Sequence, residues 1–341
     1  MQWEPRTEPG SNTADRIMDG GWDQNIFQEK LRLLHDRSLL RTLTPLESAT
    51  GPSVQHGGRE VILLSSNDYL GLATHPEVME AAIAATKRYG TGSGASRLVS
   101  GTLLPHAYLE TTLARFKGTE AALLFGAGYL ANLGVIPALL GKSGLILADR
   151  LCHASVIDAC RLSQADFRIF RHGDCNHVES ILRSRTTKRP TLIITEGVFS
   201  MDGDLAPLPD LVSLAERYSA MLYVDDAHGT GIMGVTGRGT VEHFDLEHRI
   251  PFHMGTLSKA LGSHGAFLVG TRDLVQYVIN TARSFIFTTA LPPAVAAASS
   301  AALTVIDREP ERRARLWSNR QRFFDGLKTL GCRLTPTASP I

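Results

Sequence analysis

The chain has 341 residues, of which 43% are hydrophobic and 20% are charged, which is enough apolar material for one or two globular domains. Its formal net charge of +1 gives no electrostatic reason to expect a nucleic acid or an anionic membrane as a partner. Four cysteines without a CxxC pair favour free thiols in a reducing compartment, so we expect a cytoplasmic protein without a metal site.

The N-terminal part of the chain divides into two predicted segments. Residues 1–25 contain acids, prolines and glycines but no apolar core, which predicts a disordered extension and not a signal peptide. The segment 26–60 follows. A basic, leucine-rich pattern predicts a helix over 26–45, and Gly57-Gly58 between two short extended runs predicts a hairpin.

The next stretch alternates between helix and strand signals. A helix is predicted from Pro76 to Gly90, and another ends at Gly118. Seven short apolar runs then alternate with helical or loop segments, which predicts an α/β fold with a mainly parallel, doubly wound sheet. The runs are 121–125, 144–149, 167–171, 191–197, 221–226, 251–256 and 265–270. We assign residues 61–305 to this large domain.

One uncharged stretch, residues 121–141, is long enough to span a bilayer. It contains Gly126, Gly128 and Pro137, which favour a strand, a tight turn and a buried helix. We therefore expect no membrane span there.

From residue 306 the pattern changes to a long amphipathic helix. One of its faces carries Leu316, Phe323, Leu327 and Leu330, and its arginines suit a solvated face. A single strand-like segment follows. A helix and part of a strand cannot form a separate core, so 306–341 is predicted to be part of a C-terminal domain.

Lys259 is the first candidate for chemistry. It lies between two predicted strands, among small residues, and it is the only lysine between Lys188 and Lys328. A lysine in an apolar pocket loses its proton more easily and then attacks carbonyl groups, forming a Schiff base. A surface lysine on a loop is the simpler alternative, and the local residues alone leave both open.

The motif "DDAH" supplies Asp225, Asp226 and His228 at the end of a predicted strand. Without a third nearby ligand, these residues make a weak metal site, and one of the acids suits a turn or a cap. The run "MDGD" at 201–204 lacks the remaining acids of a calcium loop. A lysine with a buried aspartate suits pyridoxal 5′-phosphate, because the aspartate keeps the ring nitrogen protonated.

A phosphate site is predicted where Gly126 and Gly128 separate a strand from a helix, since backbone N–H groups at a helix start bind phosphate. The same G-x-G-x-x-A pattern, with Asp149 beyond it, matches a dinucleotide fingerprint and gives a rival interpretation. That match leaves Lys259 unexplained. His153 follows another strand, where a structural role is the simpler reading, although an imidazole there can stack on a flat cofactor.

Six ordered motifs together resemble the α-oxoamine synthases, which are pyridoxal-phosphate acyltransferases of the aspartate-aminotransferase fold type (fold type I). The resemblance covers roughly residues 26–341. The motifs are "SSNDYLGL" (65–72), "GTGSGASRLVSGT" (90–102), "TEGVFSMDGDLAPL" (195–208), "VDDAHGTGIMGVTGRGT" (224–240), "GTLSKALGSHGAFLVG" (255–270) and "FIFTTALPPAVAAA" (285–298).

The resemblance implies a role for each matching residue. Lys259 would form the Schiff base and take the amino-acid α-proton, Asp225 would hold the ring nitrogen, and His153 would stack on the ring and contact substrate. Ser200 and His228 would contact the side of the ring that carries the hydroxyl.

The remaining implied roles concern the phosphate, the substrate and a second subunit. Gly128 and Tyr129 would bind phosphate through backbone amides, with help from Thr256, while Arg41 and Asn67 would contact substrate. Thr288 and Thr289 would reach the cofactor phosphate of the partner subunit, because active sites in this family form at a homodimer interface.

The implied reaction condenses L-alanine with a pimeloyl thioester, carried by coenzyme A or acyl carrier protein, and releases carbon dioxide and the free thiol in biotin synthesis. Members of the family continue beyond the point that matches Ile341 and carry an arginine for the amino-acid carboxylate; no residue here takes that role. Two alternatives stay open. One is a sister activity of the glycine acetyltransferase, serine palmitoyltransferase or 5-aminolevulinate synthase type, and the other is a non-catalytic copy or subunit that keeps the fold.

Overall fold

The computed structural model describes residues 25–185, 189–335 and 337–341. Contacts divide the chain into two compact units, Met1–Glu47 and Ser48–Ile341, and each is described by itself. The predicted disorder of residues 1–25 falls almost wholly outside the described residues; only Asn25 is described, and it begins the first helix.

The helix of the N-terminal unit, α1 (Asn25–Asp36), is shorter than the predicted helix over 26–45. The prediction is wrong beyond residue 36. Ser38 has a φ of 56°, and two backbone bonds close the helix end, from Ser38 N to His35 O (2.9 Å) and from Leu39 N to Leu34 O (2.8 Å). A left-handed residue of this kind ends a helix whatever apolar pattern follows it.

The predicted hairpin begins the second unit and is confirmed. Strands β1 (Ser53–His56) and β2 (Arg59–Ile62) pair antiparallel, and Gly57 and Gly58 form the two-residue turn between them. Their φ values of 58° and 70° suit a turn with two left-handed residues, which is why glycines occupy it.

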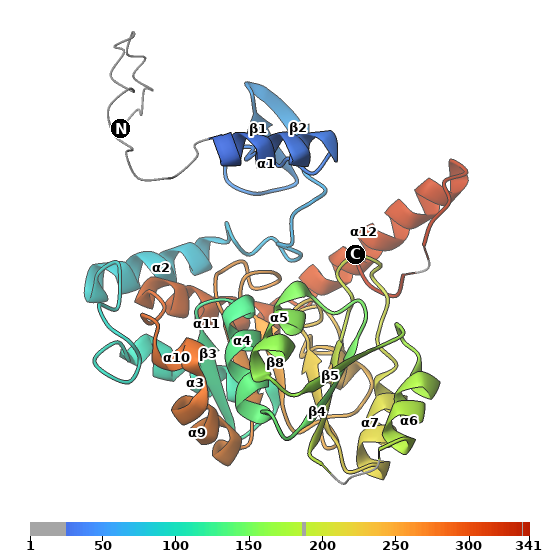
Figure 1. The fold of residues 1–341 in the computed structure, drawn as a ribbon. Coiled ribbons are helices and arrows are strands. Elements are labelled where there is room, and N and C mark those ends of the chain that lie inside the picture. The colour runs from blue at the N-terminus through green and yellow to red at the C-terminus, as the bar shows by residue number, and fades with distance from the viewer. Residues whose placement is uncertain (1–24, 186–188, 336) are drawn as a thin grey trace. The chain divides into compact units, whose positions relative to one another are not determined.

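All seven predicted strands form one sheet with the order β3-β9-β8-β7-β6-β4-β5. Figure 1 shows helices packed around this sheet. The strands are β3 (Ala121–Phe125), β4 (Leu145–Asp149), β5 (Asp166–Phe170), β6 (Thr191–Glu196), β7 (Met221–Asp225), β8 (His253–Thr256) and β9 (Ala266–Gly270). Only β9 runs antiparallel, against both β3 and β8. The predicted mostly parallel, seven-stranded sheet of an α/β protein is therefore confirmed.

Helices cover both faces of this sheet. The helices of this unit are α2 (Pro76–Tyr89), α3 (Leu104–Lys117), α4 (Gly128–Leu139), α5 (Ala154–Ser163), α6 (Cys175–Arg183), α7 (Leu208–Arg217), α8 (Thr240–His243), α9 (Arg272–Thr281), α10 (Arg283–Ile286), α11 (Pro293–Arg308) and α12 (Glu311–Thr329). One buried cluster joins α4, α5, α9 and α10 to the sheet. On the opposite face, α2, α3 and α11 pack near β3 and β9, and α6, α7 and α8 pack near β4, β6 and β7. Alternate residues of β3, β4, β6, β7 and β9 enter opposite clusters, as a doubly wound sheet requires.

The uncharged stretch 121–141 forms β3 and α4, as predicted. Ala131, Val135 and Ile136 of α4 are fully buried against the sheet, which explains why this helix carries no charge. Across the described parts of the chain, no helix combines the length and the apolar character needed to cross a membrane.

The long C-terminal helix α12 is confirmed, but its predicted apolar face divides along its length. Leu316 and Trp317, in its first half, pack against the large buried cluster of α2, α3 and α11. Phe323 and Leu330 remain 57% and 79% exposed. The boundary proposed at 305/306 between a large and a C-terminal domain stays a prediction.

Candidate active site

The carboxyl ends of three neighbouring parallel strands place acidic and hydroxyl side chains along one edge of the sheet. The register pairs Glu196 of β6 with Asp225 of β7, and Asp225 with Met254 of β8. Strand β8 then ends at Thr256, three residues before Lys259. Ligands bind at this edge in open α/β sheets, so the strand ends and the loops after them form the candidate site.

Lys259 and His228 meet directly in these loops. The Lys259 Nζ lies 2.6 Å from the His228 Nε2, and the His228 side chain is buried. Burial lowers the pKa of His228 to about 3, and the Lys259 charge acts in the same direction. Burial also lowers the pKa of Lys259, although the charges of Asp225 and Glu196 oppose that effect. An amine with a lowered pKa next to a neutral imidazole is more readily available as a nucleophile or base.

Asp225 is held by donors on two sides. Its Oδ2 accepts a bond from the Asn132 Nδ2 (2.8 Å), and its Oδ1 accepts one from the backbone N–H of Ala227 (3.1 Å). Asn132 is itself fixed by the Tyr223 hydroxyl, which donates to its Oδ1, and by Ser155 Oγ, which accepts from its Nδ2. This buried network fixes the carboxylate of Asp225 at the end of β7.

Glu196 is a second buried carboxyl group at this edge, and the sequence had not singled it out. It accepts a bond from the backbone N–H of His153, the residue that caps α5. Burial raises the pKa of Glu196 to about 8, and the neighbouring Asp225 charge adds to the rise, while the His153 N–H and Lys259 oppose it. The His153 ring accepts from Ser155 N (3.2 Å), and His153 is exposed.

The predicted anion site lies at the start of α4 and stays a prediction. Gly128 and Tyr129 are its first two residues, and N–H groups in the first turn of a helix have no partner within it. The Tyr129 hydroxyl donates to Asp158, and the Tyr129 ring meets the His153 ring edge-on at 6.3 Å. Thr256 is buried; its hydroxyl donates to Gly265 O and lies 2.7 Å from Ser258 Oγ.

Tyr69 links a further predicted residue to the site. Its hydroxyl lies 2.8 Å from the His228 Nδ1 and donates to Asn67 Oδ1 at 3.2 Å. The motif "SSNDYLGL" contains both residues, so the signal for Tyr69 was present in the sequence although only Asn67 was chosen from it. The structure thus brings Asn67 into the same network as Lys259.

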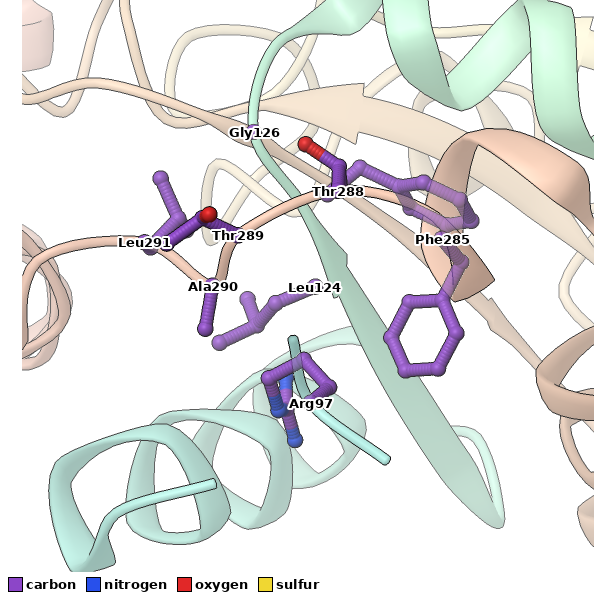
Figure 2. A pocket seen from close by; sticks show the side chains of 9 residues that line it. Arg97, Leu124, Gly126, Phe285, Thr288, Thr289, Ala290 and Leu291 are labelled. Atoms are coloured by element: carbon purple, nitrogen blue, oxygen red, sulfur yellow. The ribbon is translucent and has the colours of Figure 1, made fainter. Parts of the chain in front are cut away.

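Thr288 and Thr289 lie on the loop after α10 and share no bond with the Lys259 cluster among the interactions described. They line a small pocket with Arg97, and Figure 2 shows this loop passing beside Gly126. Thr289 forms an isolated bridge with Ser96, and Arg97 is held by a bidentate pair with Glu110 (2.9 Å for each bond). The loop is therefore fixed next to the turn that leads into α4.

Two other predicted residues have no bond with this cluster among the interactions described. Ser200 is half-buried in the turn after β6, which is closed by a bridge between Val198 and Leu205. Arg41 belongs to the N-terminal unit, and its contact with substrate stays a prediction.

The second acid of "DDAH" has a structural partner. Asp226 is fully buried and accepts bonds from Lys117 Nζ (3.2 Å), Thr230 Oγ1 (3.2 Å) and Thr240 Oγ1 (2.6 Å). The side chain of Lys117 is 1% exposed. Asp226 therefore belongs to a buried ion pair behind the site, in keeping with the turn role that the sequence left open for one of the acids.

Asp149 of the rival dinucleotide fingerprint is likewise engaged within the protein. It accepts bonds from the backbone N–H groups of Leu151 and Gly173 and from the ring of His172 (2.9 Å). Its carboxylate thus ties together the loops after β4 and β5. A carboxylate used in this way has little capacity left for the ribose of a dinucleotide.

The groups present at the sheet edge fit pyridoxal 5′-phosphate chemically. Lys259 offers an amine for the aldehyde, and Asp225 offers a buried carboxylate for the ring nitrogen. The start of α4 offers N–H groups for the phosphate, and His153 offers a flat ring. Asn132, Tyr69 and Glu196 complete this set and were not chosen from the sequence. Tyr69 lies in the quoted motif "SSNDYLGL", whereas Asn132 and Glu196 are recognised only through partners distant along the chain.

Comparisons with known proteins agree with this geometry. The family described as Aminotransferase class I and II matches residues 59–341. The chain is 52% identical to the 8-amino-7-oxononanoate synthase of Geobacter sulfurreducens, covering 89% of this chain and 78% of that protein. It is 47% identical to the enzyme of the same name from Thermoanaerobacter pseudethanolicus, covering 94% of this chain and 81% of that protein.

Solved structures give the same fold. A serine palmitoyltransferase from S. paucimobilis, solved with a PLP adduct of myriocin, aligns with a TM-score of 0.87 at 34% identity, covering 94% of this chain and 81% of that one. An 8-amino-7-oxononanoate synthase from Francisella tularensis aligns with a TM-score of 0.69 at 30% identity, covering 80% and 77%.

Proposed function

The chain belongs to the Aminotransferase class I and II family, and we propose that it catalyses the reaction of an 8-amino-7-oxononanoate synthase in biotin synthesis. In that reaction the α-carbon of L-alanine loses its proton and forms a bond to the carbonyl carbon of a pimeloyl thioester. The C–S bond breaks and the thiol leaves. The alanine carboxylate leaves as carbon dioxide, and a proton replaces it at the α-carbon.

The enzyme is pyridoxal-phosphate-dependent, and the residues that would hold the cofactor are those gathered at the sheet edge. Lys259 would bind its aldehyde, Asp225 its ring nitrogen, and Gly128 and Tyr129 its phosphate, with Thr256 nearby. His153 would lie against the ring. When bound, the cofactor supplies an electron-withdrawing ring that makes the bonds to the amino-acid α-carbon easier to break.

The observation that carries the proposal is the buried pair at the strand ends, where the Lys259 Nζ lies 2.6 Å from the His228 Nε2. Burial lowers the pKa of both groups. Once its amine is free, Lys259 Nζ is suited to take the α-proton of alanine and to return a proton to the product. A positioned base of this kind contributes about 10²–10⁴-fold to rate. Asn132 and the Ala227 N–H hold Asp225 in place, so its charge would not need to reorganise to meet the ring nitrogen of the cofactor.

We also propose that the enzyme is a cytoplasmic homodimer. The dimer is supported by the resemblance to the α-oxoamine synthases, whose active sites form at a subunit interface. That resemblance assigns a role there to Thr288 and Thr289, whose loop passes beside Gly126 (Figure 2). They would serve the phosphate of a second copy. The free cysteines, of which Cys152 and Cys160 are buried, support a reducing compartment.

The alternative is a sister activity, and the structural similarity to a serine palmitoyltransferase is the observation that favours it. Sequence weighs against it, because identity reaches 52% with an 8-amino-7-oxononanoate synthase and 34% with that structure. The cofactor chemistry is shared between these activities, so the residues around Lys259 do not separate them.

Substrate preference tests the proposal. The purified protein is loaded with cofactor, and free thiol is measured with L-alanine, glycine or L-serine against pimeloyl, acetyl and palmitoyl thioesters. We expect L-alanine with the pimeloyl thioester to give the highest kcat/KM. Preference for glycine with acetyl-CoA or for serine with palmitoyl-CoA would instead assign a sister activity.

A further inference from the structure

A continuous hydrogen-bonded chain of three polar side chains leads away from Lys259. The Lys259 Nζ lies 2.6 Å from the His228 Nε2, and the His228 Nδ1 lies 2.8 Å from the Tyr69 hydroxyl. The Tyr69 hydroxyl in turn donates to Asn67 Oδ1 at 3.2 Å. The proposed function requires neither Tyr69 nor Asn67, the last two residues of this hydrogen-bonded series.

His228 is neutral in this environment and therefore carries a single ring proton. It is buried, and burial lowers its pKa to about 3, with further lowering by Lys259 and His153. The Tyr69 hydroxyl faces the imidazole ring of His228. Burial raises the pKa of Tyr69 to about 12, so the hydroxyl keeps its proton. The carboxyl groups of Asp225 and Glu196, at the strand ends, oppose the lowering of the Lys259 pKa by burial.

The position of that ring proton follows from counting donors. A phenol hydroxyl has one proton, and an amide oxygen such as Asn67 Oδ1 only accepts. Since Tyr69 donates its proton to Asn67, its oxygen is left to accept from His228. The His228 proton is then on Nδ1, and the lone pair of Nε2 faces the Lys259 amine.

We propose that Tyr69, oriented by Asn67, is a positioning residue that holds His228 in its Nδ1–H tautomer and so keeps a hydrogen-bond acceptor on the Lys259 amine. This acceptor stabilises the ammonium form of Lys259. In the neutral form it takes one amine N–H, which turns the nitrogen lone pair away from the imidazole. The catalytic role of Lys259 rests on the proposed function, whereas the tautomer of His228 does not depend on it.

Long-range ¹H–¹⁵N NMR correlation on cofactor-free protein labelled with ¹⁵N-histidine reads the tautomer directly. The His228→Asn variant assigns the signals. We expect Nδ1–H in the wild type between pH 6 and 8. Tyr69→Phe and Asn67→Leu should both move the proton to Nε2, the first by removing the acceptor and the second by freeing the Tyr69 proton to point at Nδ1.

Two variants control for general disturbance. Asn67→Asp keeps an acceptor for Tyr69 and should preserve the Nδ1–H form. Tyr218→Phe removes a different tyrosine hydroxyl, one bonded to Glu179 between α6 and α7, and should also leave the signals of His228 unchanged.

Lys259 provides a second readout that does not depend on turnover. The pH at which half of Lys259 reacts with an acylating reagent, measured by peptide mass spectrometry, should fall by about one unit in Tyr69→Phe, because the ammonium loses its acceptor. An Nε2–H tautomer in the wild type, or identical tautomers in wild type and Tyr69→Phe, would overturn the inference. Both results are independent of whether the protein condenses alanine with a pimeloyl thioester.

Discussion

Replacing Glu196 by glutamine should change how stability depends on pH. Glu196 is 3% exposed, and its pKa rises to about 8, first through burial and then through the charge of Asp225. The unfolded chain loses this proton near the ordinary glutamate pKa of about 4.3, whereas the folded chain keeps it to about pH 8. Between those values the folded state binds more protons, so the free energy of unfolding falls as pH rises.

The magnitude follows from the size of the pKa rise. At about 1.4 kcal/mol per pKa unit, a rise from the ordinary value to about 8 corresponds to at most about 5 kcal/mol, reached above pH 8. The amide of Glu196→Gln keeps an acceptor for the His153 N–H but carries no charge to desolvate. We therefore expect the variant to lose this pH-dependent destabilisation, so that its stability relative to the wild type rises toward pH 8 by at most about 5 kcal/mol.

The assay is urea unfolding of cofactor-free wild type and Glu196→Gln from pH 5 to pH 9. The difference between them should be smallest at pH 5 and should grow toward pH 8. Glu216→Gln is the matched control, because Glu216 is an exposed glutamate paired with Arg249, and its curve should parallel that of the wild type over this range. Parallel curves for wild type and Glu196→Gln would show that Glu196 is ionised at neutral pH and would refute the reasoning.

Three further outcomes follow from the site. Lys259→Ala should abolish the covalent attachment of pyridoxal 5′-phosphate by borohydride, measured by mass spectrometry, while the exposed Lys142→Ala should not; labelling that persists in Lys259→Ala would reject the assignment. Asn132→Ala should weaken cofactor binding by roughly tenfold in fluorescence titration, because the carboxylate at the end of β7 loses a charge-assisted bond, and an unchanged Kd would contradict this. Lys117→Met should lower the free energy of unfolding by about 3–5 kcal/mol, because Asp226 stays buried without its cation, and a loss below about 1 kcal/mol would mean that the pair contributes little.

Much of the fold was predictable because its signals are local. Each strand of the large sheet is a short apolar run that ends at a loop, and Gly57-Gly58 fixed the hairpin turn. The end of α1 was not predictable in this way. Its apolar pattern continues past residue 36, but a left-handed conformation at Ser38 ends the helix there.

The residues of the candidate site also fall into two groups, those that the sequence indicated and those that it did not. Lys259, Asp225 and His153 follow strand ends and have types that suggest chemistry, so the sequence pointed to them. Asn132 and Tyr69 act through single bonds to Asp225 and His228, which lie 93 and 159 residues away along the chain. Only folding brings such pairs together, so their contacts are not encoded locally, although Tyr69 itself lies in the motif "SSNDYLGL".

The fate of the alanine carboxylate tests the central claim most directly. L-alanine labelled with ¹³C in its carboxyl group is supplied with a pimeloyl thioester to the cofactor-loaded enzyme, and carbon dioxide, free thiol and the amine product are measured together. We predict that one labelled carbon dioxide appears for each thiol released, and that the amine product has the mass of 8-amino-7-oxononanoate without the label. Thiol release without labelled carbon dioxide, or label retained in the product, would contradict the proposed decarboxylative condensation.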